Sequence, residues 1–442
     1  MRLKRFATAG TILILTLTVS CSKENTGEKK APAQARQIVK IEKGFYGWDS
    51  ITLRSAYSRL DIIPELGGKI MGYDLRGFQV LWHDPKREGE LYKNEGYGFG
   101  ESFFNPGGAK VWPAPQGWSG PGEWPGPPDN VLDGSPYEVM QQGNSVTVTS
   151  PSDTGEGRSG LQFSHTYSLA QSASIVALKL SMKNVVDRSV KWGLWHLATV
   201  PVDRKMTVYV PVNQNDWHVI FGDKNNPQWL GVENGLFRAQ YDKRVGKVGM
   251  KAREGWAAWH DEENNIVYAM LFPVQKGAEY PDSGSNFEIW TSGAGTYTAN
   301  NREFQTEYAP ETAMMELEVM GPLSGLRPGE SSSLDVTWGV CRCSGVKHVT
   351  PYGVVAQEPV IEGNTVRAKF GVFYGGYLMI EYIDKNGNRK GIKNSMEISP
   401  ISEVIIDQDI EDIASFAAGV RYHIQPFGTE TLGTLGQVMF KK

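Results

Sequence analysis

Strand-like alternation is the feature that most constrains the fold of this chain. From about Gln37 onward, apolar and polar residues alternate in short runs that are rich in β-branched residues, for example at 145–149, 207–210 and 334–338. Turns rich in Gly, Asn and Asp separate these runs, and only residues 409–418, near the end, have the pattern of a short helix. Alternation with a period of two places successive side chains on opposite faces of a sheet. We therefore predict an all-β chain built as a sandwich or barrel.

Tryptophan usage divides the chain into two parts. All 13 Trp lie between Trp48 and Trp338, and the composition changes near residues 345–353. The last part keeps strand-like segments and a hairpin signal at 384–388. We expect a large sandwich domain over residues 39–348 and a small C-terminal β-sandwich domain over 349–442.

The N-terminus has the pattern of an export signal. Arg2, Lys4 and Arg5 form a positive segment, and an apolar stretch over 6–19 follows. That stretch is shorter than the ~20 residues that a permanent membrane-spanning helix needs. Small residues precede Cys21, and a polar segment that cannot bury enough apolar surface to fold follows it.

This arrangement resembles the lipobox of bacterial lipoproteins, with Thr18 where that pattern usually has Leu. The resemblance implies a signal peptide over 1–20, a lipid on Cys21 and a flexible tether over 21–38. The protein would then lie in the cell envelope and contact the membrane through its lipid anchor alone. The alternative is an ordinary signal peptide followed by an incidental cysteine.

Charge and cysteine content exclude several functions. The net charge of −4, without a Lys/Arg stripe, argues against a nucleic-acid partner. Cys341 and Cys343 lie one residue apart on a predicted strand, where they form either a strained disulfide or two free buried thiols. No second Cys/His pair lies at ligand spacing, so we expect no metal site.

The segment 107–136 is the most unusual stretch of the sequence. It is dense in proline, which predicts a stiff extended loop and neither a helix nor a central strand. Trp112, Trp118 and Trp124 lie on it. These indoles either pack beneath the loop as a cover or line a cleft.

A sugar would suit such a cleft. Sugars have flat apolar C–H faces and polar edges, which indoles and neighbouring polar groups can match. Lys110, Gln116 and Asp133 would supply the polar groups.

Several motifs resemble galactose-mutarotase-like proteins. Gly67-Gly68-Lys69-Ile70 is similar to the turn of the first hairpin in that superfamily, with Lys69 for the usual Arg. Trp-Pro-Ala-Pro-Gln from Trp112 and Trp-Pro-Gly-Pro-Pro from Trp124 resemble an uncharacterised bacterial branch of it, a domain of unknown function. The segments 314–319 and 321–330 do so too, and the resemblance covers about 45–345. It implies a β-supersandwich with a sugar-sized cleft.

The resemblance also implies a mechanism. In mutarotases a His protonates the ring oxygen and a Glu removes the anomeric hydroxyl proton, without metal or cofactor. His196 is the candidate acid, unless it is a core histidine. Glu316 is the favoured base, and Glu318, on the same strand face, and Glu288 are the alternatives. Each of these carboxylates otherwise has a structural or solvated role.

The sequence thus predicts a membrane-anchored protein whose ligand is a saccharide, and carbohydrate-directed catalysis stays open. The alternatives are an aldose 1-epimerase, or a non-catalytic envelope lipoprotein with a degenerate cleft. Catalysis requires His196 and one of the carboxylates to converge beside Trp112. The predicted substrate-binding residues are Lys69, Lys110, Trp112, Gln116, Trp118, Trp124 and Trp195.

Overall fold

The computed structural model describes residues 40–93, 96–98, 104–117, 123–203, 205–299 and 302–440. The predicted signal peptide, Cys21, the tether and Trp118 lie outside these residues.

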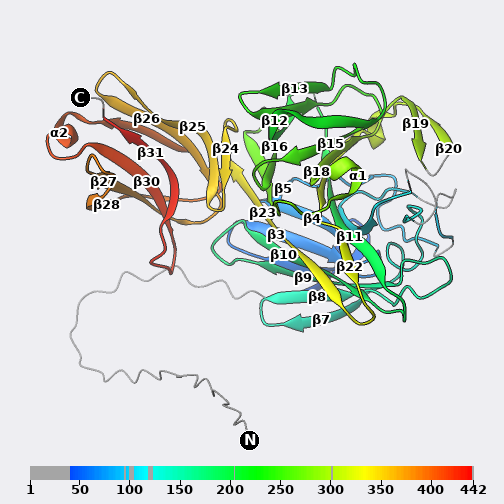
Figure 1. The fold of residues 1–442 in the computed structure, drawn as a ribbon. Coiled ribbons are helices and arrows are strands. Elements are labelled where there is room, and N and C mark those ends of the chain that lie inside the picture. The colour runs from blue at the N-terminus through cyan, green and yellow to red at the C-terminus, as the bar shows by residue number, and fades with distance from the viewer. Residues whose placement is uncertain are drawn as a thin grey trace, which may run out of the picture. The chain divides into compact units, whose positions relative to one another are not determined.

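Two large antiparallel sheets form the main domain, and β12 takes part in both (Figure 1). In pairing order the first sheet contains β1 (Lys40–Phe45), β2 (Trp48–Arg54), β3 (Ser58–Ile63), β4 (Lys69–Leu75), β6 (Ala109–Ala114), β11 (Val190–Pro201), β21 (Met314–Met320), β18 (Phe287–Thr291), β15 (Gly246–Ala252) and β12 (Met206–Phe221). The second contains β7 (Glu138–Gln142), β8 (Ser145–Thr149), β9 (Leu161–Leu169), β10 (Val176–Asn184), β23 (Ser331–Arg342), β17 (Ile266–Leu271), β16 (Trp256–Asp261), β12, β14 (Leu236–Gln240) and β13 (Trp229–Glu233).

Smaller elements complete this domain. They are β5 (Phe78–Gln79) beside β4, β22 (Ser324–Leu326) beside β11, the hairpin of β19 (Gly295–Ala299) and β20 (Arg302–Thr306), α1 (Pro281–Gly284) and the 3-10 turn η1 (Pro310–Thr312).

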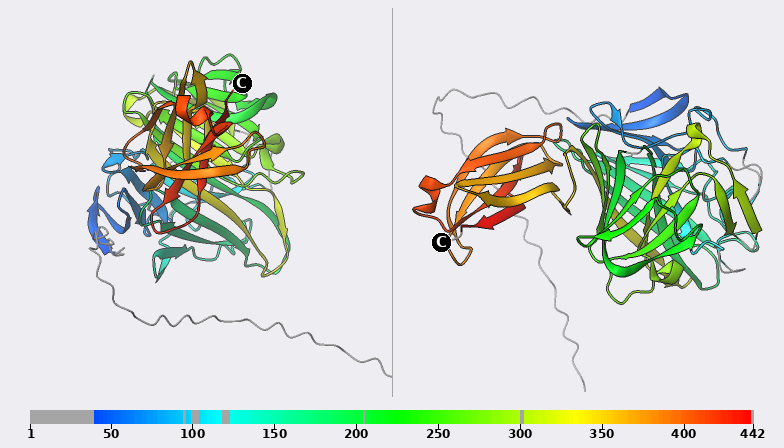
Figure 2. Two further views of the ribbon diagram at one scale, coloured as in Figure 1. Left: turned by 90° about the vertical axis from the view of Figure 1, so that its left-hand side faces the viewer. Right: turned by 90° about the horizontal axis from the view of Figure 1, so that it is seen from above.

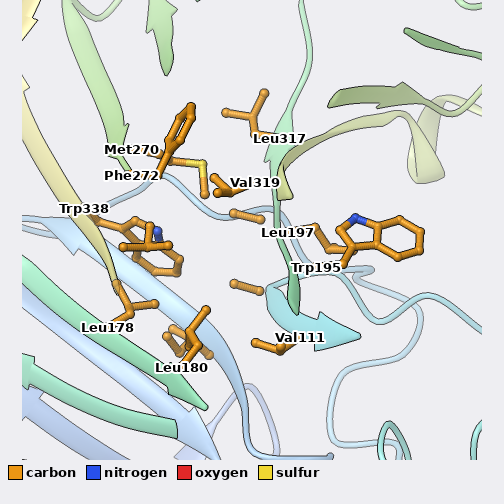
Figure 3. Close-up of a cluster of buried hydrophobic side chains, with 14 of the residues drawn as sticks. Val111, Leu178, Leu180, Trp195, Leu197, Met270, Phe272, Leu317, Val319 and Trp338 are labelled. Carbon is orange, nitrogen blue, oxygen red and sulfur yellow. The ribbon is translucent and has the colours of Figure 1, made fainter. Parts of the chain in front are cut away.

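The core of the main domain lies between the two sheets. Leu178 and Trp338 from the second sheet meet Val111 and Val319 from the first (Figure 3). Trp195 projects from the other side of β11, away from this core. The first sheet therefore has an inner face that packs on the second sheet and an opposite face, which we call the site face.

The C-terminal strands form a second β-sandwich with its own core (Figure 2). One of its sheets contains β24 (His348–Thr350), β25 (Gly353–Glu362), β26 (Thr365–Val372) and β29 (Val404–Asp409), and the other β28 (Arg389–Ile398), β27 (Gly376–Ile383), β30 (Gly419–Pro426) and β31 (Gly433–Met439). A third apolar cluster joins this module to the main domain and includes Cys341, Phe373 and Val354. Across the same junction, the Ser174 hydroxyl donates to the carbonyl oxygen of Phe373 at 3.2 Å.

The structure confirms the all-β class and corrects three details. The predicted C-terminal helix is only one turn, α2 (Glu411–Ala414). Cys341 and Cys343 are free and buried, so the disulfide alternative is wrong. In the part of the chain that the structure describes, no helix combines the length and apolarity needed to cross a membrane.

The third correction concerns the proline-rich segment, because residues Ala109–Ala114 form strand β6. Pairing with β11 extends from Ala109 to Ala114, whereas among the described residues β4 is paired with β6 at Ala109 alone. Pro113 has no N–H to donate, and on this nearly free edge none is required. The proline density of 107–136 predicts a stiff extended loop and excludes a central strand, whereas the structure forms a strand with one nearly free edge here.

Candidate functional site

A lysine buried between two glutamates lies at the centre of the site face. Lys247 on β15 places its Nζ 2.7 Å from Glu288 Oε2 and 2.9 Å from Glu318 Oε2. The indole N–H of Trp195 donates to Glu318 Oε2 at 2.7 Å, and the ammonium lies 4.3 Å from the centre of an indole ring of Trp195. Glu288 and Glu318 are directly paired across β18 and β21. One ammonium group therefore serves two adjacent carboxylates.

Burial makes this cluster hold a proton. Removing the carboxylates from water raises the pKa of Glu318 to about 7 and raises that of Glu288 as well, because Lys247 offsets the burial only in part. Burial alone would lower the pKa of Lys247, but the two glutamates raise it. The cluster thus contains a cation and carboxyl groups that keep a proton to a higher pH than an exposed glutamate does.

A second ion pair lies beside the first on the same face. Lys110 Nζ lies 3.1 Å from Glu316 Oε1 and donates to Asn105 Oδ1 at 2.8 Å. The Asn105 amide in turn donates to Glu316 Oε1 at 2.9 Å. Lys110 also lies 4.7 Å from an indole ring centre of Trp112. Asn105 therefore covers the ion pair from the loop side.

The predicted binding lysine Lys69 belongs to a third buried pair. Its Nζ lies 2.7 Å from Asp133 Oδ1, and the same carboxylate oxygen accepts the indole N–H of Trp112 at 2.8 Å. Burial lowers the pKa of Lys69, and Asp133 opposes that shift. This pair ties the loop carrying Asp133 to β4 and β6.

The predicted aromatic cleft is closed. Trp112, Trp124 and Trp195 pack on one another with ring centroids 5.1 to 6.3 Å apart, and they are 5%, 0% and 3% exposed. Gln116 is buried as well. The prediction that these side chains border an open hollow is wrong, because the indoles are buried against one another. The sequence left two alternatives, indoles that pack beneath the segment as a cover or indoles that line a cleft. The described indoles agree with the first.

An open pocket of about 320 Å³ adjoins the ion pairs. Trp82 and Trp290 supply half-buried indoles, Asn105 supplies its amide, and Asp84, Arg87 and Glu307 supply charged groups. Trp290 is paired with Lys247 on one side and with Glu316 on the other, so the pocket reaches both clusters. We call it the indole pocket.

A histidine that the sequence did not single out shares the site face. His218 on β12 is paired with Gly249, and Gly249 with Glu288. The His218 ring leans across this glycine, since its Cε1 lies 2.9 Å from where a Cβ on Gly249 would be. Burial lowers the pKa of His218, and Asp282 favours its charged form. The backbone of Asp282 is strained at φ 47°.

His196, the predicted acid, lies on the wrong face. Its ring stacks on Trp338 with centroids 5.5 Å apart, within the core. Neither ring nitrogen has a hydrogen-bond partner among the residues that the structure describes, and burial lowers the pKa of His196 to about 3. His196 is therefore a neutral core histidine, and its prediction as the acid is wrong. Glu288, Glu316 and Glu318 do converge, on the opposite face of the sheet.

A family model matches most of the main domain. The family model for a domain of unknown function, DUF4380, matches residues 49–341, about two thirds of the chain. The chain belongs to the DUF4380 family. The predicted membership of an uncharacterised family is thus confirmed. No curated protein matches this DUF4380 chain significantly.

Some of the solved structures similar to the DUF4380 chain have titles that name an epimerase or a mutarotase-like protein. One is a putative aldose 1-epimerase from Escherichia coli, 15% identical with a TM-score of 0.46, which covers 66% of this chain and 98% of that one. Another is a galactose mutarotase-like protein from Lactobacillus casei, 12% identical with a TM-score of 0.44, over 66% and 99% of the two chains. A third, from Clostridium acetobutylicum, is 13% identical with a TM-score of 0.44, over 70% and 99%.

The sequence analysis did not identify three sets of residues in this site of the DUF4380 chain. Lys247 occurs in a short strand, where a lysine is typical of a solvated face. Trp82 and Trp290 look like other strand-end aromatics. His218 carries no local motif. The pairing of β12, β15, β18 and β21 brings His218, Lys247 and Trp290 together.

Proposed function

We propose that this protein binds a saccharide in the indole pocket. The observation that carries the proposal is the combination of half-buried Trp82 and Trp290 with an amide, two carboxylates and a guanidinium in one open pocket of about 320 Å³. Flat apolar C–H faces of a sugar suit the indoles, and hydroxyl groups suit the polar rim. The volume is in the range of small-ligand sites, ~300–1,000 Å³.

The ion pairs beneath the pocket support the same function. An ion pair and two hydrogen bonds connect Lys110, Glu316 and Asn105, and Asn105 also lines the pocket. A binding amide fixed in this way loses little conformational freedom when a ligand arrives. The clusters on the site face therefore act as a rigid support for the pocket.

A glycan array tests the proposal. We expect the wild-type protein to bind at least one saccharide, and Trp290→Ala to lose most of that signal. Intrinsic tryptophan fluorescence provides a second measurement in solution. Trp229→Ala, a substitution of the same type at a tryptophan that does not line the pocket, is the matched control. Absence of binding to every glycan by the wild type would reject the proposal.

We also propose that a lipid on Cys21 anchors the protein in the cell envelope. The support is the sequence pattern around Cys21 alone. Mass spectrometry of the membrane fraction would show diacylglyceryl-modified Cys21, and Cys21→Ala would release the protein. A membrane-bound Cys21→Ala variant without modification would contradict this.

Proton-transfer chemistry of the aldose 1-epimerase type is the second candidate. The observation that favours it is the cross-strand row of His218, Gly249, Glu288 and Glu318 on one face. This row offers a proton donor and an acceptor, which ring opening requires. Polarimetry on freshly dissolved α-D-galactose and α-D-glucose tests it. An optical rotation that decays at the spontaneous rate with wild-type protein would remove this candidate and leave binding.

A further inference from the structure

A second pocket lies near the indole pocket and has a volume of about 430 Å³. Phe221 at the end of β12 and Tyr297 of the β19–β20 hairpin supply its aromatic wall. Thr296, Thr298 and Glu303 of the hairpin supply hydroxyl and carboxylate groups. We call it the hairpin pocket. Its chemistry, rings beside hydroxyl-binding groups, matches that of the indole pocket.

Strand pairing places both pockets on the site face. Phe221 is paired with Lys247, and Lys247 with Trp290. Directly paired residues project from the same face of a sheet. Phe221 and Trp290 are thus two strands apart in one row, about 10 Å between backbones at the ~4.8 Å strand spacing. That span suits two linked sugar rings.

The walls of the pockets also touch. Val245 lines the indole pocket, and its carbonyl oxygen lies 3.0 Å from where a Cβ on Gly222 would be. Gly222 lines the hairpin pocket. Thr306, at the other end of the hairpin, lines the indole pocket. The base of the β19–β20 hairpin therefore borders both pockets.

Stacking fixes the aromatic wall of the hairpin pocket. The rings of Phe221 and Tyr297 have centroids 4.9 Å apart and an interplanar angle of 25°. Tyr297 and Phe304 lie 5.3 Å apart at 17°. A side chain held between two others offers its hydroxyl and ring edge in one position, which favours recognition of a ligand with a fixed outline.

We propose that the ligand is an oligosaccharide that occupies both pockets, with one end in the indole pocket and the next sugars in the hairpin pocket. This inference rests on the proposed saccharide function and adds the substrate class to it. A free monosaccharide would fill only one of the two pockets.

Chain-length dependence of binding tests the inference. The probe is an array carrying cello-, malto-, xylo-, manno- and galacto-oligosaccharides, each at lengths of one to six units. For the best series, we expect wild-type affinity to rise between one unit and three. Tyr297→Ala should reduce affinity for the longer chains about threefold to tenfold and leave the shortest bound chain unchanged. Trp290→Ala should reduce binding at every length.

Two further variants keep the test decisive. Glu303→Gln preserves the hairpin and should weaken only the longer chains. Tyr377→Ala removes an exposed tyrosine in the C-terminal module and should change nothing. Wild-type affinity that does not depend on length, or a length dependence that survives both hairpin variants, overturns the inference while the saccharide function stands. Absence of all glycan binding overturns both.

Discussion

Two regions of the molecule bury glutamates beside cations, and they do so with opposite charge ratios. On the site face, Glu288 and Glu318 share the single ammonium of Lys247. In the C-terminal module, Glu381 alone accepts hydrogen bonds from Arg389, Arg421 and His423.

The ratio determines the protonation state in each region. Burial raises the pKa of Glu318 to about 7. Burial also opposes ionisation of Glu381, but hydrogen bonds from His423, Arg389 and Arg421 lower its pKa to about 2. A shortage of cations leaves an exchangeable proton on the site face, whereas an excess fixes a permanent charge in the module. The first arrangement suits a functional site and the second a structural clamp.

Removing the shared cation should have the largest effect. Lys247→Met leaves two buried carboxylates without a counter-ion, and we expect a loss of about 3–5 kcal/mol in the free energy of unfolding. Urea unfolding measures it. Lys86→Met, which removes the exposed partner of Glu311, is the matched control and should change the free energy of unfolding far less, because water already screens that pair. Equal losses in the two variants would show that the site-face cluster depends on its cation no more than an exposed ion pair does.

The site face should also make stability fall with rising pH. The folded protein binds more protons than the unfolded chain between the ordinary Glu pKa of 4.5 and about 7, so this contribution is full below 4.5 and is lost as pH rises through 7. Between these pH values we expect the free energy of unfolding of the wild type to decline by about 1–3 kcal/mol relative to that of Glu318→Gln. Thermal melting from pH 4.5 to 8 measures it. A wild-type profile parallel to that of Glu318→Gln would contradict the raised pKa.

The clamp should show the opposite pH dependence. Because the pKa of Glu381 is lowered to about 2, its contribution is present above 4.5 and is lost as pH falls toward 2. Glu381→Gln should cost about 1–2 kcal/mol at pH 7, a modest figure because the partner arginines are partly exposed. Unfolding of the variant at pH 7 and pH 3 measures it. A cost that does not shrink at pH 3 would argue against the clamp.

His196 should have the smallest effect. It is a neutral core histidine whose ring nitrogens have no hydrogen-bond partner in the described part of the chain, so His196→Leu should change the free energy of unfolding by less than about 1 kcal/mol. Saccharide binding should be unchanged. Lost binding by a stably folded His196→Leu protein would return this residue to the candidate site.

Local sequence patterns were sufficient to predict many of the strands and turns. The alternation at 145–149 became β8, and the hairpin signal at 384–388 connects β27 to β28, with Asp384 N–H donating to the Asn388 carbonyl at 2.9 Å. Glu316 and Glu318 share a face, as a period of two requires.

The site could be predicted only in part, because its composition depends on long-range strand pairing. His196 and Trp195 are neighbours in sequence, and a shift of one residue decides which of them faces the site. Lys247 and His218 meet the glutamates only through the β12–β15–β18–β21 order. Nor does alternation show which indoles become buried when the chain folds. Trp112 is buried, whereas Trp82 is only half-buried.

The two thiols at the junction provide a built-in reporter. Cys341 and Cys343 are sealed between the main domain and the module, and burial raises the pKa of both. An alkylating reagent can reach them only while this junction is open. The rate of their modification therefore measures how often the junction opens in the native state.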